Sequence, residues 1–314
     1  MKARPERAVV VVSALIALAI VVAVLALVAR AGSGGDASAQ RTASSALPRA
    51  TADRFDGARA LRLAALQLRY GPRPAGSAQL RALAVRLQAL LGPGARLEEV
   101  PGHPGERNVV LELAGREPGK ALVVGAHYDT EPNVPRFVGA NDGAAGTAIV
   151  VELARVLRRL PLDRPVQLVL FDGEELPLGG TDARFAEEAL RGSKAYVAAH
   201  RAELGEMVLL DFVGNRGLRL PREATSNEAL WRRVRTAARA VGVGSVFPAG
   251  TGTGIIDDHT PFLQAGIPAV DFIDWPYRYY HVPADTLDKL DPRALDAVGE
   301  AVTELVRRSA TAQP

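Results

Sequence analysis

Acidic and histidine side chains recur in this sequence directly after apolar runs. GAHYDT contains His127 and Asp129, and FDGEEL contains Glu174 and Glu175. Further candidates occur in GANDGAAG, LLDFVG and YYHVPADT, namely Asp142, Asp211 and His281. Imidazole nitrogen and carboxylate oxygen are zinc ligands, and a hydrolytic zinc site needs an open position for water with a carboxylate nearby to take the water's proton. The combination therefore predicts a zinc site that activates water.

The spacing of these residues assigns candidate roles. We expect Glu174 to accept the proton and the following residues to bind metal: His127, Asp142, Glu175, Asp211 and His281. Because Glu174 and Glu175 are adjacent, they point in different directions from one turn, so that one can bind metal while the other reaches the water. Residues two apart in a strand face the same side, so Asp129 can hydrogen-bond the ring of His127 and fix which nitrogen is free for metal.

The apolar runs before these clusters indicate buried strands. They read ALVVGA, VQLVLF, MVLL and PAVDFI, so the polar groups lie where strands end, which is where open α/β sheets bind ligands. The sequence contains no H-E-x-x-H, no G-x-S-x-G, no G-x-x-x-x-G-K-[ST] and no cysteine. The common zincin, serine-hydrolase, phosphate-loop and thiol mechanisms therefore lack their defining residues.

The periodicity of apolar residues predicts the elements that position these clusters. Helical spacing occurs over 55–68, 80–91 and 147–160, and strand-like runs occur over 96–100, 108–113 and 121–125. The small residues from Gly143 to Gly146 allow the third helix to begin close against the metal site, where its N-terminal dipole also favours carboxylate. About 260 residues remain after the N-terminal segment, enough for one large α/β domain.

Taken in order, the motifs GAHYDT, GANDGAAG, LVLFDGEEL, LLDFVG, IDDHTPF and YYHVPADTLDKLD resemble the zinc aminopeptidase family, metallopeptidase family twenty-eight, whose relatives include the glutaminyl cyclases. The resemblance runs from about Phe55 to about Arg308. It implies a three-layer α/β/α zinc-peptidase fold with a mixed, mostly parallel central sheet. It also implies two zinc ions bridged by Asp142, with His127 and Asp211 completing one metal, Glu175 and His281 completing the other, and Glu174 as general base.

Several features separate aminopeptidase from cyclase within that resemblance. The segment from Leu176 to Arg191 before Gly192-Ser193-Lys194, and the sequence Asp257-Asp258-His259, look like the cyclases. NDGAAG, the VPADTLDKLD ending and Tyr280, where the cyclases carry Trp, look like the peptidases. The resemblance gives Asp258, His259 and Tyr280 supporting or substrate-binding roles.

We therefore expect a zinc exopeptidase of the aminopeptidase type that acts on the N-terminus of a peptide or protein. The alternative is a glutaminyl-peptide cyclotransferase with a single zinc that forms N-terminal pyroglutamate. A non-catalytic binding ectodomain is a third possibility, against which the retention of all five ligands and of Glu174 argues.

The N-terminus predicts a membrane anchor. Residues 8–29 carry no charge, and about 20 apolar residues suffice to cross a bilayer. Lys2, Arg4 and Arg7 precede this run, which predicts a cytoplasmic segment 1–7, a single span 8–29, a flexible linker 30–52 and an extracytoplasmic catalytic domain 53–314. The alternative is a signal peptide cleaved at Ala37-Ser38-Ala39.

Charge and cysteine content narrow the partners. The net charge is only +3, and the densest basic stretch, 231–239, has apolar residues at helical spacing, which indicates a solvated helix rather than a nucleic-acid surface. The absence of cysteine excludes disulfides and thiolate ligands.

Overall fold

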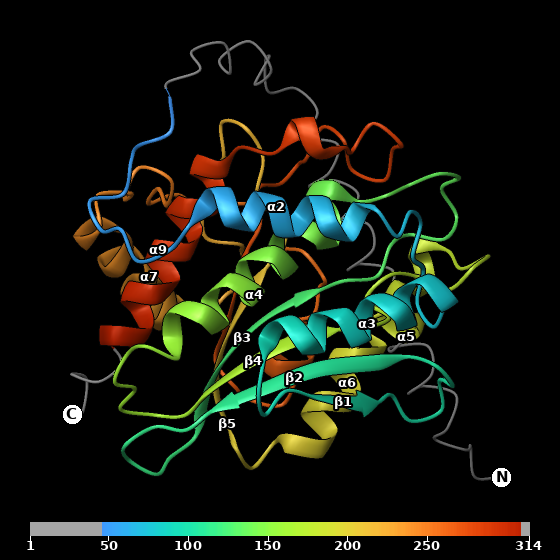
Figure 1. Ribbon diagram of the computed structural model, residues 1–314, viewed down its shortest axis with the longest axis horizontal. Helices are drawn as coiled ribbons and strands as arrows, with labels where there is room; N and C mark the ends of the chain where they lie inside the picture. The colour runs from blue at the N-terminus through green and yellow to red at the C-terminus, as the bar shows by residue number, and fades with distance from the viewer. Residues whose placement is uncertain (1–45, 309–314) are drawn as a thin grey trace, which may run out of the picture. The chain divides into compact units, whose positions relative to one another are not determined.

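A mixed six-stranded sheet forms the centre of the described part of the chain, residues 46–308 of a computed structural model (Figure 1). The first two pairings along it, β1 with β2 and β2 with β4, are antiparallel, and the other three are parallel. In spatial order the strands are β1 (Arg96–Glu99), β2 (Arg107–Leu113), β4 (Val166–Phe171), β3 (Ala121–His127), β5 (Leu204–Leu210) and β6 (Ala269–Phe272).

Helices cover both faces of this sheet, as Figure 1 shows for α2 and α3 on one side and α6 on the other. The helices are α2 (Gly57–Leu68), α3 (Ala78–Leu91), α4 (Gly146–Leu157), α5 (Phe185–Glu188), α6 (Arg191–His200), α7 (Glu228–Ala240), α8 (Thr260–Gln264) and α9 (Pro292–Arg308). Short turns of other helix types are η1 (Ala140–Ala145), η2 (Asp182–Arg184) and η3 (Leu287–Lys289).

The two faces of the sheet support separate cores. Alternate side chains such as Val109 and Leu111 pack with α2, α3, α4, α7 and α9, whereas Val110 and Val169 pack with α6 and α8. All residues of β3 and β4 are buried, because these parallel strands are covered on both faces. This burial explains why their sequences are continuous apolar runs rather than alternating ones.

The expected mixed α/β fold is confirmed, and each element expected from periodicity is present within a few residues of its expected bounds. The expected segments 1–7 and 8–29 lie outside the described residues, as does most of the expected linker. Its last residues already belong to the domain, since Leu47, Ala50 and Ala52 pack against the larger core. Between residues 46 and 308, no helix combines the length and the hydropathy that a bilayer span needs.

Candidate metal centre

Three neighbouring parallel strands end at the metal centre. His127 is the last residue of β3, Asp211 directly follows β5, and the Glu174-Glu175 turn comes three residues after β4. Because β4, β3 and β5 lie side by side and run in the same direction, their carboxyl ends meet at one edge of the sheet. The expected grouping of these side chains is therefore present.

Asp142 reaches the same edge from η1, where the backbone leaves helical geometry. Its φ and ψ are −85° and 101°, and Gly143 follows at a φ of 82°, a conformation that glycine adopts without strain. The buried carboxylate of Asp285 accepts hydrogen bonds from the backbone N–H groups of Asn141 and Asp142. Behind this turn, a Cβ on Gly146 would lie 2.1 Å from the carbonyl oxygen of Leu210, so only glycine lets α4 start this close to β5.

His127, Asp142 and Asp211 form one set of donors, which we call the first position. The Nε2 atom of His127 lies 3.3 Å from Oδ1 of Asp142 and 3.5 Å from Oδ1 of Asp211. Ligands on a tetrahedral zinc, with bonds near 2.0–2.1 Å, are separated by about 3.3 Å. The donors of the first position are therefore spaced as zinc requires.

His281, Glu175 and the other oxygen of Asp142 form the second position. Here Nε2 of His281 lies 3.2 Å from Oε2 of Glu175 and 3.6 Å from Oδ2 of Asp142. His281 has a φ of 47°, a left-handed conformation that is costly for a residue with a side chain and recurs at functional sites. Asp142 thus presents one oxygen to each histidine, as a bridging ligand would.

Asp129 supports both His127 and the glutamate turn. Its Oδ1 lies 3.5 Å from Nδ1 of His127, which leaves Nε2 facing the first position. Its two oxygens also accept hydrogen bonds from the backbone N–H groups of Glu174 and Glu175, at 3.3 and 3.1 Å. Asp129 therefore orients the histidine ring and the turn together, a wider role than the sequence indicated.

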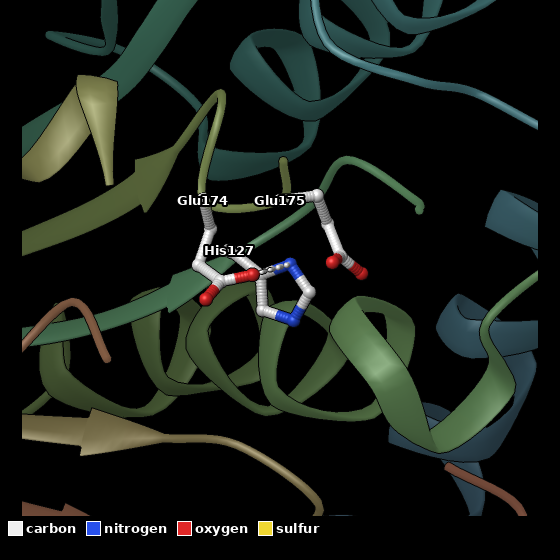
Figure 2. Close-up of side chains that lie close together, drawn as sticks. All are labelled: His127, Glu174 and Glu175. Carbon is white, nitrogen blue, oxygen red and sulfur yellow. Dashed lines mark ion pairs between the residues drawn. The ribbon is translucent and has the colours of Figure 1, made fainter. Parts of the chain in front are cut away.

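The two glutamates diverge from their turn, with Glu174 reaching toward the ring of His127 (Figure 2). Oε2 of Glu174 lies 3.8 Å from Nδ1 of His127, on the opposite ring nitrogen from Asp142 and Asp211. This carboxylate is 8% exposed, and both glutamates also form a possible donor group with His127. The divergence expected from adjacent glutamates is thus present.

Negative charge accumulates in this centre without water to solvate it. Burial raises the pKa of Glu174 and of Glu175 well above the usual range, and the carboxylate of Asp142 raises that of Glu175 further. Burial also raises the pKa of Asp211 to about 7. Within residues 46–308, Oδ2 of Asp142 and Oε1 of Glu175 are buried and have no hydrogen-bond partner. Bound divalent cations would neutralise this charge and take up these orphaned oxygens, so the residues fit zinc.

The three residues expected to support the site take different positions. Tyr280 stacks on the ring of His281, with centroids 3.8 Å apart, and is 41% exposed. Asp258 is fully buried and close enough to Glu174 to raise its pKa, after the larger effect of burial. His259 faces away from the metal donors, and its Nε2 lies 3.0 Å from Oγ1 of Thr225 and 3.4 Å from Glu223.

The sequence did not indicate four further residues around the centre. The guanidinium of Arg73, fully buried, donates to the carbonyl oxygens of Tyr128, Val138 and Gly139 and so fixes the chain that leads to Asp142. The others are Asp285, Arg191, whose Nη1 donates to the carbonyl oxygen of Glu175, and Glu131, which lies beside Glu175 and His281. Of these, only Asp285 falls within a quoted motif, so its place in VPADT was the available signal.

Comparison with known proteins identifies the family. The sequence profile described as Peptidase family M28 matches residues 108–306, which contain all five candidate metal ligands and Glu174. The chain belongs to peptidase family M28. Its zinc-peptidase resemblance is thereby confirmed.

Members of family M28 with two kinds of name are similar to this chain. Aminopeptidase YwaD of Bacillus subtilis is 31% identical over 199 residues, which are 59% of this chain and 40% of that protein. Glutaminyl-peptide cyclotransferase-like protein of Mus musculus is 32% identical over 219 residues, 59% of this chain and 56% of that protein. The chain therefore spans only about half the length of these curated relatives.

A solved family structure matches more completely. Porphyromonas gingivalis glutaminyl cyclase superposes with a TM-score of 0.73 at 30% identity, covering 82% of this chain and 100% of that chain. The M28 fold and a zinc-dependent type of centre are thus supported, and the family is shared by hydrolases and cyclases.

Proposed function

We propose that this protein is a zinc-dependent aminopeptidase that hydrolyses the N-terminal peptide bond of its substrate with two metal ions. The observation that carries the proposal is the placement of Asp142, whose Oδ1 and Oδ2 face His127 and His281 at 3.3 and 3.6 Å. One carboxylate shared between two histidines, each with a further acidic ligand, is an arrangement for two metals. A single zinc with an open position would need only about three of these five donors.

The residues around the two positions fit hydrolysis. Zinc bound there would polarise the scissile carbonyl and lower the pKa of a water molecule. Glu174 is the remaining carboxylate of the turn and would take the proton from that water and pass it to the departing amine. Asp129 holds Glu174 in place through the backbone N–H of the turn. Entry of the substrate is expected beside His281 and Tyr280, because their side chains are the exposed part of the centre.

Cyclisation of an N-terminal glutamine is the second candidate. The observation that favours it is the pair Asp257 and Asp258, both buried and both close enough to Glu174 to raise its pKa, after the larger effect of burial. These extra carboxylates are not needed to bind two metals. In cyclisation the substrate's own amine attacks its side-chain carbonyl, water must be excluded, and Asp142, Glu175 and His281 would suffice to bind one zinc.

Side-by-side assays at equal enzyme concentration separate the candidates. The zinc-loaded protein is given a panel of aminoacyl anilides and short peptides, and in parallel a peptide with N-terminal glutamine. We expect release of N-terminal residues to be faster than formation of pyroglutamate. Efficient pyroglutamate formation with no amino acid released from any peptide would contradict hydrolysis and support cyclisation.

We also propose that residues 8–29 anchor the protein in the membrane with the catalytic domain outside the cytoplasm, because this uncharged stretch follows three basic residues. Fractionation and protease treatment of intact cells test this arrangement. A mature chain that is released from the membrane and begins at Gln40 would instead support the cleaved signal peptide.

A further inference from the structure

Glu131 is a buried acidic residue next to the second position. It comes four residues after His127, in the loop beyond β3, and is 5% exposed. Its carboxylate, that of Glu175 and the ring of His281 each offer one donor atom, and these three atoms lie within 4.8 Å of one another. The second position therefore has a candidate donor beyond Asp142, Glu175 and His281.

The side chain of Glu131 is held in place rather than free to turn toward water. Its Oε1 accepts a hydrogen bond of 2.7 Å from the backbone N–H of Asn133. The side chain of Asn133 in turn accepts one of 2.7 Å from the N–H of Gly179, in the segment that follows Glu175. The loop carrying Glu131 and the segment after Glu175 are thus joined beside the metal centre, which keeps the two carboxylates together.

The number of donors distinguishes the two positions. Zinc sites with four protein ligands are typically closed, whereas those that act on substrates keep one place open. The first position has three donors in one group, His127, Asp142 and Asp211. The second has Glu131, Glu175 and His281 in one group, and Oδ2 of Asp142 lies 3.6 Å from Nε2 of His281.

We propose that Glu131 is a fourth protein ligand of the second position. The second position then binds zinc more tightly and is mainly structural, while the first keeps the open place where water is activated. The orphaned Oδ2 of Asp142 and Oε1 of Glu175, both buried, mark where a cation is missing its partners. This inference rests on the proposed function only in requiring that zinc binds at both positions.

Zinc binding measured without substrate tests the role of Glu131. Metal-free protein is titrated with zinc in competition with a chromogenic chelator, for the wild type, Glu131→Gln and the control Glu117→Gln, an exposed glutamate in the loop after β2. We expect the tighter of two wild-type affinities to fall at least about tenfold in Glu131→Gln, with the weaker one unchanged, by comparison with the effects of outer-shell partners on metal sites. The control should keep both affinities.

Two further measurements exclude a folding artefact. Metal-free Glu131→Gln should melt at the same temperature as the wild type or higher, because one carboxylate leaves an uncompensated acidic group, while the rise in melting temperature on adding zinc should shrink. Glu131→Asp, which keeps the charge but shortens the side chain, should also weaken the tighter site.

Unchanged affinities in both variants, or equal weakening of both sites, would overturn the assignment of Glu131. The outcome is separable from that of the proposed function. A protein that shows the expected zinc affinities but releases no amino acid contradicts the aminopeptidase proposal and supports the Glu131 ligand. A peptidase whose zinc affinities do not depend on Glu131 contradicts only this inference.

Discussion

Replacing Arg191 by methionine should destabilise the domain, because this guanidinium joins three segments beside the metal centre. Its Nε donates to both carboxylate oxygens of Glu106, at 3.1 and 2.9 Å. Its Nη1 donates to the carbonyl oxygens of Glu175 and Glu188, at 3.0 and 2.7 Å. Arg191 thus connects the start of β2, the metal-binding turn and the end of the segment that begins at Leu176.

The size of the effect follows from burial. The side chains of Arg191 and Glu106 are only 6% and 11% exposed, so methionine would leave a carboxylate unpaired in a largely dry site. Removing one partner of a buried ion pair costs about 3–5 kcal/mol. That is a large part of the roughly 5–15 kcal/mol by which a typical domain is stable. At about 2–4 °C per kcal/mol for a domain of this size class, the melting temperature should fall by about 6–20 °C.

Urea denaturation of the metal-free protein measures this loss directly, without a contribution from bound zinc. Arg184→Met is the matched control, since Arg184 pairs with Glu187 on the same segment and both side chains are mostly exposed, at 61% and 73%. An exposed pair of this kind is worth at most about 1 kcal/mol. A loss in Arg191→Met no larger than in the control would refute the reasoning. The double variant Arg191→Met/Glu106→Leu should recover part of the stability, because it removes the unpaired charge.

Three further outcomes are expected. Glu174→Gln should lower turnover about a hundred- to ten-thousandfold while zinc content stays nearly intact, since the amide keeps the shape but cannot accept a proton; near-normal rates in the metal-loaded variant would remove Glu174 from the role of base. Asp142→Asn should lower zinc occupancy at both positions together, as measured by metal analysis, and loss at one position alone would contradict bridging. Although burial raises it, hydrogen bonds, the largest from His259, lower the pKa of Glu223 to about 2 from 4.5. The contribution of Glu223 to stability is therefore present above pH 4.5 and lost as pH falls toward 2. Metal-free Glu223→Gln should lose less stability than the wild type over that window, and equal acid sensitivity would contradict the assigned cause.

The metal ligands were predictable from the sequence because each follows a strong local signal. His127 and Asp211 come directly after continuous apolar runs, and such runs are the clearest sequence sign of buried parallel strands. Parallel neighbours end at the same edge, so the sequence order of the motifs was enough to place their side chains together. The periodic helices were predictable for a similar reason, as the buried face of α7 illustrates with Trp231 and Val234.

The supporting contacts were not predictable, because they depend on single residues far apart in the chain. Arg191 and Glu106 are 85 positions apart, and no periodic pattern marks either as buried. Arg73 lies in a proline-rich loop that reads as exposed, yet its side chain is fully buried and bonded to carbonyl oxygens. Local sequence indicates which residue types can do chemistry, whereas the tertiary fold decides which charges are buried together.

The first position decides which of the two candidate reactions this centre can perform. Glu174, Asp211 and Asp257 are all buried near His127, and carboxylates that close together need either a cation or protons to neutralise them. With a metal at the first position the carboxylates stay charged, and hydrolysis has both its metals. With protons there instead, the carboxylates can only hydrogen-bond to one another or to the substrate's amine, and the second position alone would serve cyclisation.

Stepwise addition of zinc to the metal-free protein therefore separates the reactions in a single titration. Because the second position is expected to fill first, peptide hydrolysis should stay low through the first equivalent of zinc and rise with the second. The chelator competition described for Glu131 reports occupancy in the same samples, so activity can be plotted against the filling of each position. Hydrolysis that reaches its maximum at one equivalent would contradict the two-metal arrangement. Pyroglutamate formation that reaches its maximum there would show that the first position holds protons, because a reaction in which the substrate supplies its own nucleophile has no use for a second metal.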